Sequence, residues 1–65
     1  FNQLNINNND PIDYAVIYDL IGKKVKTISI NNTRTIIDVS SLEKGVYFLQ
    51  VHTKQEIINK KFIKQ

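Results

Sequence analysis

The chain contains no cysteine in its 65 residues. It therefore forms no disulfide, no thiolate zinc site and no cysteine nucleophile. Small secreted domains often depend on disulfides, and a chain this short buries only roughly 60% of the surface that it exposes when unfolded. A single core of this size rarely contributes more than about 3–5 kcal/mol. We expect sheet packing alone to hold the chain together.

Other reactive groups are also scarce. His52 is the only histidine. Its neighbours on the same strand face, Gln50 and Lys54, are polar, so we interpret it as a solvent-facing residue and not as a general base. The two glycines, Gly22 and Gly45, form no phosphate-binding motif. No apolar run approaches the roughly 20 residues of a membrane span, so we expect no membrane insertion.

Carboxylates are few and dispersed. One lies in each turn or strand end: Asp10, Asp13, Asp19, Asp38, Glu43 and Glu56. Residues 7–13 come nearest to a calcium loop, but they lack its glycine and closing glutamate. The sequence therefore predicts no metal, no cofactor and no enzymatic activity.

The residues that are abundant favour β-structure. Ile, Val, Thr, Tyr and Phe dominate the apolar set, and no window shows helical periodicity. The alternation predicts six strands, at residues 3–7, 13–20, 24–30, 33–39, 46–53 and 56–64. Short strands at regular spacing are typical of an antiparallel sandwich or a small barrel.

Polar clusters predict the connections between these strands. They lie at residues 7–11, 19–23, 31–32, 40–44 and 54–55. Gly22 suits a left-handed turn position, and Leu42 is expected to point inward from a connector that forms one helical turn. The strand at 13–20 is apolar on both faces, with Ala15 and Ile17 on one and Val16 and Tyr18 on the other. We therefore predict that it is central and covered on both sides.

Positive charge gives the chain a net +3. Lysines gather at one hairpin and at the terminus, as Lys23, Lys24, Lys26, Lys60, Lys61 and Lys64. With aromatic residues they could bind single-stranded nucleic acid, but the aromatics alternate with aliphatics as core residues do, so we expect no nucleic-acid partner. The basic, partly apolar terminus is interpreted either as an edge strand protected by lysines or as a handle that a partner captures by strand addition.

Three segments in fixed order resemble a known family. They are VIYDLIGKKV at 16–25, IDVSSL with GVYFL between 37 and 49, and the closing KFIKQ at 61–65. Together they closely resemble the C-terminal sorting domain, type A, of the bacterial type IX secretion system, also called the Por secretion system. The resemblance covers nearly the whole chain.

This resemblance implies an all-β fold, namely a small antiparallel immunoglobulin-like β-sandwich of about six to seven strands. Residues 1–65 would form a single sorting domain, a fragment from the end of a larger secreted protein. The domain would be non-catalytic and read in the periplasm, and its cargo would be secreted or displayed on the surface of a bacterium of the Bacteroidetes group. The implied partners are an outer-membrane translocon, a shuttle protein, a sortase that removes the domain or uses it for surface attachment, and the upstream cargo domain.

The family's recognition residues carry over by motif. Gly45 and Tyr47 match its Gly-x-Tyr motif, and Asp19 and Gly22 match a structural turn. The basic end is matched by Lys60, Lys61, Phe62, Ile63, Lys64 and Gln65. Family members usually carry a Pro-Asn-Pro stretch just before the first strand, and this chain starts after that point. The cleavage site would also lie upstream, so no sortase site is assigned.

An alternative is an immunoglobulin-like accessory module that binds glycan or protein on a secreted enzyme. Glycan sites usually need exposed aromatic rings on one face. Only Phe48, Tyr14 or Phe1 could serve in this way.

Overall fold

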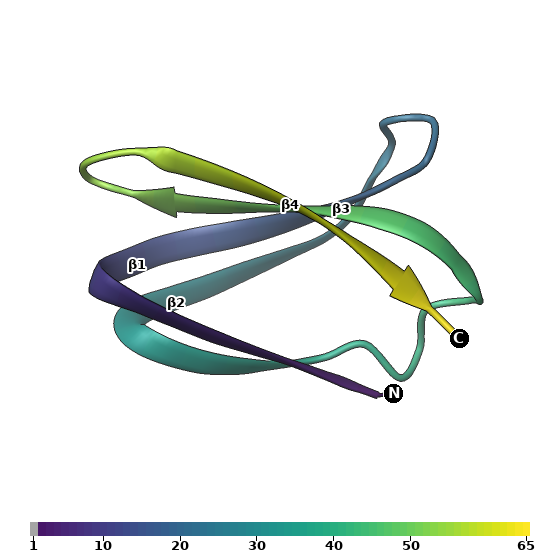
Figure 1. Ribbon diagram of the computed structural model, residues 1–65, viewed down its shortest axis with the longest axis horizontal. Coiled ribbons are helices and arrows are strands. Elements are labelled where there is room, and N and C mark those ends of the chain that lie inside the picture. Colours follow the sequence, from purple (N-terminus) through teal and green to yellow (C-terminus); the bar gives the residue numbers. More distant parts are fainter. Residues whose placement is uncertain (1) are drawn as a thin grey trace.

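The computed structural model describes residues 2–65, which form one antiparallel sheet of four strands and contain no helix (Figure 1). The strands are β1 (Gln3–Asp19), β2 (Lys24–Asp38), β3 (Gly45–Thr53) and β4 (Ile57–Lys64). Their order in the sheet is β2-β1-β3-β4. Strand β1 is therefore internal, as predicted for residues 13–20, and β4 lies at one edge.

The sheet bends over itself because β1 and β2 both turn sharply in mid-strand (Figure 1). The first part of β1, residues 3–7, pairs only with the end of β2, whereas its second part pairs with β2 on one side and with β3 on the other. The first part of β1 is thus left with one unpaired edge, and it faces the rest of the sheet across the core.

Asparagine allows these bends without ending the strands. In β1, the Asn8 side chain donates a hydrogen bond to the carbonyl oxygen of Asp10 at 3.0 Å. In β2, Asn31 has a φ of 54°, a conformation that asparagine tolerates better than most residues. Between Asn7 and Ile12, β1 takes five steps where β2 takes two. These extra residues bend β1 as a bulge bends a strand.

The bends correct the predicted strand count. Residues 7–11 and 31–32 were expected to be turns that separate short strands, but they lie within β1 and β2. The structure has four strands in one sheet, and it does not confirm an immunoglobulin-like sandwich of six to seven strands. The two polar segments were correctly located, but they bend β1 and β2 and do not end them.

The core lies between the two arms of the bent sheet. Its buried side chains come from the inner faces of β1, β2 and β3 and from the residue after β2: Ile12, Ala15, Ile17, Ile37, Val39, Tyr47, Leu49 and Val51. Asp13 is an extra residue relative to β3, because Ile12 pairs with Thr53 and Tyr14 pairs with His52. This bulge lets Ile12 and Ala15 both face the core.

The connector between β2 and β3 partly matches its prediction. Leu42 packs against the core as expected, and its N–H donates to the carbonyl oxygen of Val39 at 3.1 Å. Residues 40–44 form turns and bends without a helical turn. The connector thus closes one end of the core with a single leucine.

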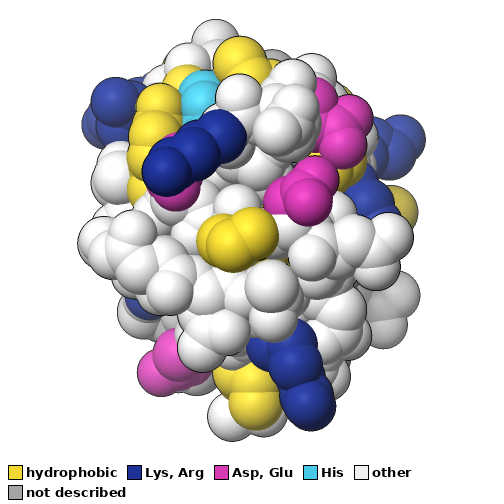
Figure 2. Space-filling model, turned by 90° about the vertical axis from the view of Figure 1, so that its left-hand side faces the viewer, with side chains coloured by type: hydrophobic (Ala, Val, Ile, Leu, Met, Phe, Trp, Pro, Cys, Tyr) yellow, Lys and Arg dark blue, Asp and Glu magenta, His cyan; other side chains and the backbone are white. Residues whose placement is uncertain are grey.

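The outer face of the sheet is not covered by a second layer. Val16 is buried there, but Tyr14 is 40% exposed and Phe48 is 39% exposed. The prediction that both faces of the central strand are covered is therefore wrong except at Val16. Where the molecule is viewed from the end at which the strands bend, hydrophobic side chains form only separate spots among polar ones (Figure 2).

Candidate functional site: the terminal strand and its groove

Strand β4 carries the basic terminus and pairs with β3 along its whole length. The register places Phe62 opposite Tyr47 and Lys64 opposite Gly45. The two parts of the chain that were predicted for recognition, the Gly-x-Tyr motif and the terminus, are thus direct cross-strand neighbours. This register follows from the tight turn between β3 and β4, where the Thr53 N–H donates to the carbonyl oxygen of Glu56 at 3.0 Å.

Tyr47 contacts the terminal strand on the side of the sheet that faces the core. Its side chain is only 8% exposed. Its hydroxyl donates to the carbonyl oxygen of Glu43 at 2.8 Å, and its ring stacks on Phe62 with centroids 5.5 Å apart and planes at 20°. The hydrogen bond satisfies a hydroxyl that burial would otherwise penalise. Tyr47 therefore holds β4 in place and is not itself presented to a partner.

Gly45 begins β3 with a backbone conformation that favours glycine. Its φ is +155°, and a Cβ added at this position would meet no atom within 4 Å. The requirement for glycine is therefore one of backbone conformation and not of space. Gly45 lets the connector enter β3 at the angle that aligns Tyr47 with the terminal strand.

The side chains of β4 alternate between the core and the solvent. Phe62 and Lys64 face inward, whereas Lys61 and Ile63 face outward, Ile63 with 51% of its surface exposed. Gln65 follows the strand and is exposed. The residues of the terminus that a partner can reach directly are therefore Lys61, Ile63 and Gln65, together with Lys60, which is described below.

Lys64 is the only buried charged residue in the part of the chain that the structure describes, at 8% exposed. Within residues 2–65 its side chain forms no hydrogen bond or ion pair, yet no buried side-chain nitrogen there lacks a partner. Its ammonium group must therefore reach solvent at the end of a buried aliphatic stem.

A groove separates β4 from the first part of β1. No Cα atom of β1 lies within 8 Å of one in β4, and the space between them has a volume of about 360 Å³. Its apolar lining comes from β1, β3 and β4: Leu4, Ile6, Leu49, Val51, Ile58 and Phe62. Its polar lining residues are Asn5, Asn7, Asn8, Lys60 and Lys61.

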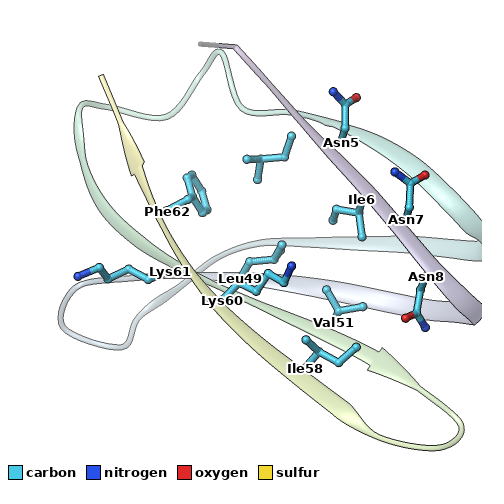
Figure 3. A pocket seen from close by; sticks show the side chains of 11 residues that line it. Asn5, Ile6, Asn7, Asn8, Leu49, Val51, Ile58, Lys60, Lys61 and Phe62 are labelled. Carbon is cyan, nitrogen blue, oxygen red and sulfur yellow. The ribbon is translucent and has the colours of Figure 1, made fainter.

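The side chains around the groove point in different directions. Ile6, Leu49 and Val51 point into it, and Lys60 extends from β4 into the same space, whereas Lys61 points away (Figure 3). Sequence reasoning missed this groove because it exists only where the bend in β1 brings residues 3–8 opposite β4. The one available signal was the alternation of Leu4 and Ile6 with asparagine.

The turn after β1 is closed by Asp19. Its carboxylate accepts hydrogen bonds from the backbone N–H groups of Ile21 at 3.1 Å and Lys23 at 2.8 Å. Gly22 has a φ of +87° in this turn. Both residues therefore shape the hairpin at the end of the sheet where β3 begins.

Asp38, the last residue of β2, is held in its ionised form by its neighbours. Hydrogen bonds from the Ser40 side chain and backbone N–H, with the nearby positive charge of Lys26, lower the pKa of Asp38 below its ordinary value of 3.8. Lys26 also donates to the carbonyl oxygen of Asp38 at 2.8 Å. These contacts fix the end of β2 before the connector.

His52 is half-buried, which corrects the prediction of a solvent-facing residue. Its ring stacks on Tyr14 with centroids 4.2 Å apart, and its Nε2 lies 2.6 Å from the Gln50 side-chain oxygen. Both contacts are with neutral groups, so the structure gives His52 no carboxylate that could orient it as a base.

Residues 2–65 contain neither a metal-binding cluster nor a membrane-spanning helix. No group of three or more histidine, aspartate or glutamate side chains there could hold a metal ion. No helix in that range is long and apolar enough to cross a membrane. Phe1, one of the aromatic residues considered for glycan binding, lies outside the described residues.

Comparison with known proteins gives one result. The family described as "Secretion system C-terminal sorting domain" matches residues 1–65, which is the whole chain. No curated protein and no solved structure matches.

Proposed function

Because the chain belongs to the family of C-terminal sorting domains of the type IX secretion system, we propose that its terminal strand is the surface by which the secretion machinery recognises it. Membership makes the chain a sorting signal of a secreted or cell-surface protein, in a family that is non-catalytic in general. Lys60, Lys61, Ile63 and Gln65 contact the machinery, while Gly45 and Tyr47 position them.

The observation that carries this proposal is the edge position of β4. The strand pairs with β3 on one side only, and side chains of its last residues are exposed. An edge strand at a chain end can be captured by backbone pairing. Its lysines meanwhile limit indiscriminate association between edges.

The wider pathway follows from the family as a further proposal. Residues 1–65 act as one unit that is read in the periplasm by the translocon, shuttle protein and sortase. The unit is then removed or used to attach the cargo to the cell surface. The bent sheet, with the first part of β1 facing β3 and β4, supports a relation to the immunoglobulin-like sandwich expected for this family.

An export assay tests the role of the terminal strand. A fluorescent protein would be fused to the chain, extended by the family's Pro-Asn-Pro stretch, and expressed in a bacterium that has the pathway. Deleting residues 60–65 would also remove the buried Phe62 and Lys64, so substitution of the exposed pair Lys61→Ser and Ile63→Ser is preferable. We expect this variant to lose most of its export without loss of folding, as checked by circular dichroism.

The opposite edge of the sheet offers a matched control. Lys24 and Val25 are an exposed lysine and an exposed β-branched residue on β2, and changing both to serine removes the same kinds of group. Export of this control should match that of the unmodified chain. Equal export of the β4 and β2 variants would refute the role that we assign to the terminus.

A second candidate function, glycan binding by an accessory module, rests on the outer face of the sheet. Tyr14 and Phe48 are both exposed there on adjacent strands, and Tyr18 pairs with Phe48. Binding of the isolated domain to a glycan array, abolished by Phe48→Ala, would favour this function. A silent array together with active export would favour sorting.

A further inference from the structure

Two unpaired strand edges face each other across the groove. Residues 3–7 of β1 pair only with β2, and β4 pairs only with β3. In both Figure 1 and Figure 3 the first part of β1 and β4 run in opposite directions along the groove. The backbone groups at these edges require hydrogen-bonding partners if they are buried. A polypeptide strand carries backbone N–H and C=O groups at the matching spacing.

The two strand edges that flank the groove are too far apart to pair directly. Neighbouring strands lie about 4.8 Å apart, so two strands that flank a third are separated by about 9.6 Å. The Cα atoms of β1 and β4 are all more than 8 Å apart, which excludes direct pairing between the two strands. A strand inserted here would be antiparallel to one edge and parallel to the other, as occurs in mixed sheets.

The apolar lining of the groove sets the pattern of side chains that fits. Ile6, Leu49 and Val51 form its inner surface (Figure 3). Because alternate residues of a strand point to opposite faces, an occupant would place every second side chain against this surface. An alternating apolar and polar sequence therefore fits better than a uniformly apolar one.

Lys60 adds a charge requirement. It extends into the groove, and the groove residues include two lysines and no carboxylate. Within residues 2–65, the Lys60 side chain forms no hydrogen bond or ion pair, although its backbone pairs with Leu49 of β3. An inward-pointing charge on an edge strand keeps other strands from pairing with it, and the same charge favours a strand whose acidic side chain meets it.

We propose that this groove binds one extended peptide segment of the secretion machinery, with alternating apolar residues and an acidic side chain that meets Lys60. This inference rests on the proposed function and names the chemistry of the partner. A second copy of the chain fits less well, because the chain has a net charge of +3 and its own edge strand is rich in lysine.

Peptide binding to the purified chain tests the proposal. The probes are fluorescein-labelled nine-residue peptides of alternating threonine and valine, in which one central valine is replaced by glutamate, glutamine or lysine. Fluorescence anisotropy should show the glutamate peptide binding at least about tenfold more tightly than the lysine peptide, because like charges brought together are strongly disfavoured. Backbone amide shifts in NMR spectra should change at residues 3–8 and 58–61.

Two variants localise the effect. Lys60→Glu should reverse the order of the peptides, so that the lysine peptide binds best. Lys61→Glu makes the same charge change on the neighbouring residue, which points away from the groove, and should keep the original order. Reversal by both variants would indicate long-range charge attraction only and would overturn the proposal.

Further outcomes would overturn peptide binding in the groove or the role of the terminus. Absence of binding by every peptide, or amide shifts confined to the outer face near Phe48, would overturn the proposal. Sedimentation that shows a dimer whose groove amides are protected without peptide would identify a second copy as the occupant and would equally overturn it. If the Lys61 and Ile63 double variant lost export but no peptide bound, peptide binding in the groove would be refuted and the role of the terminus in export would stand. Peptide binding with unimpaired export of that variant would refute the role of the terminus.

Discussion

Tyr47 and Phe62 stack across the β3–β4 pair, with ring centroids 5.5 Å apart. This contact joins the tyrosine of the Gly-x-Tyr motif to the chain's basic terminus. Because Tyr47 is buried and Phe62 is half-buried, the stack fixes the strand from the inner side while the outer side of β4 stays exposed. The motif thus acts through the position of β4.

We expect this stack to be measurable by a double-mutant cycle. Tyr47→Leu and Phe62→Leu, singly and together, should give a coupling energy of about 0.5–1.5 kcal/mol, as found for aromatic pairs beyond their area burial. Urea unfolding of the four proteins measures it. Additive effects of the two substitutions would show that the rings are neighbours without favourable interaction.

The hydroxyl of Tyr47 is expected to contribute separately. Tyr47→Phe keeps the ring but removes the hydrogen bond to the carbonyl oxygen of Glu43. The free energy of unfolding should fall by about 1 kcal/mol. A matched control is Tyr14→Phe, since Tyr14 is 40% exposed and its hydroxyl has no hydrogen bond within residues 2–65. A loss in the control as large as that at Tyr47 would contradict the prediction.

Gly45→Ala should destabilise the chain through the backbone. No atom within 4 Å would clash with the added Cβ, but the φ of +155° is one that other residues rarely adopt. We expect a loss of about 1–3 kcal/mol, measured by thermal unfolding. Lys44→Ala, one residue earlier and exposed, should change stability far less, and equal effects of the two would refute the argument.

Stability should fall at low pH partly through Asp38. Its pKa is lower in the folded state than the ordinary value of 3.8, so the unfolded chain binds a proton more readily. The contribution of Asp38 is therefore present above about pH 4 and is lost as the pH falls through its folded pKa. Asp38→Asn should flatten the pH dependence of unfolding in that range.

The control for Asp38 is Glu56→Gln, which removes one negative charge from an exposed position elsewhere. Chemical denaturation at a series of pH values between about 2 and 6 covers the relevant range. An unchanged pH dependence in Asp38→Asn would show that the contacts with Ser40 do not stabilise the ionised carboxylate.

Lys60 should also protect the chain against self-association. Lys60→Val keeps strand propensity but removes the inward charge from an edge strand, so we expect concentration-dependent oligomers. Size-exclusion chromatography with light scattering would detect them. Lys61→Val changes the outward neighbour, and if only that variant associated, the protective role would belong to the outer face.

Much of the local structure could be predicted from the sequence. The alternation of Ala15 and Ile17 with Val16 and Tyr18 identified the two faces of the central strand, and the connector with its inward Leu42 lies where polar residues indicated it. The extent of β3 and β4 was correct to within one residue at each end. These features depend on side chains that are close in sequence, so local patterns suffice to predict them.

The bends, the register of β1 with β2 and the groove were set by tertiary structure. An asparagine-rich segment can end a strand or bend it, and only pairing with a neighbour decides between these outcomes at residues 7–11 and 31–32. The contact of Tyr47 with Phe62, by contrast, follows from the tight turn between β3 and β4. Local sequence determined which residues form strands and which faces they bury. The position of β4, at an edge opposite the first part of β1, was decided by the closure of a small core, because that closure depends on the whole chain.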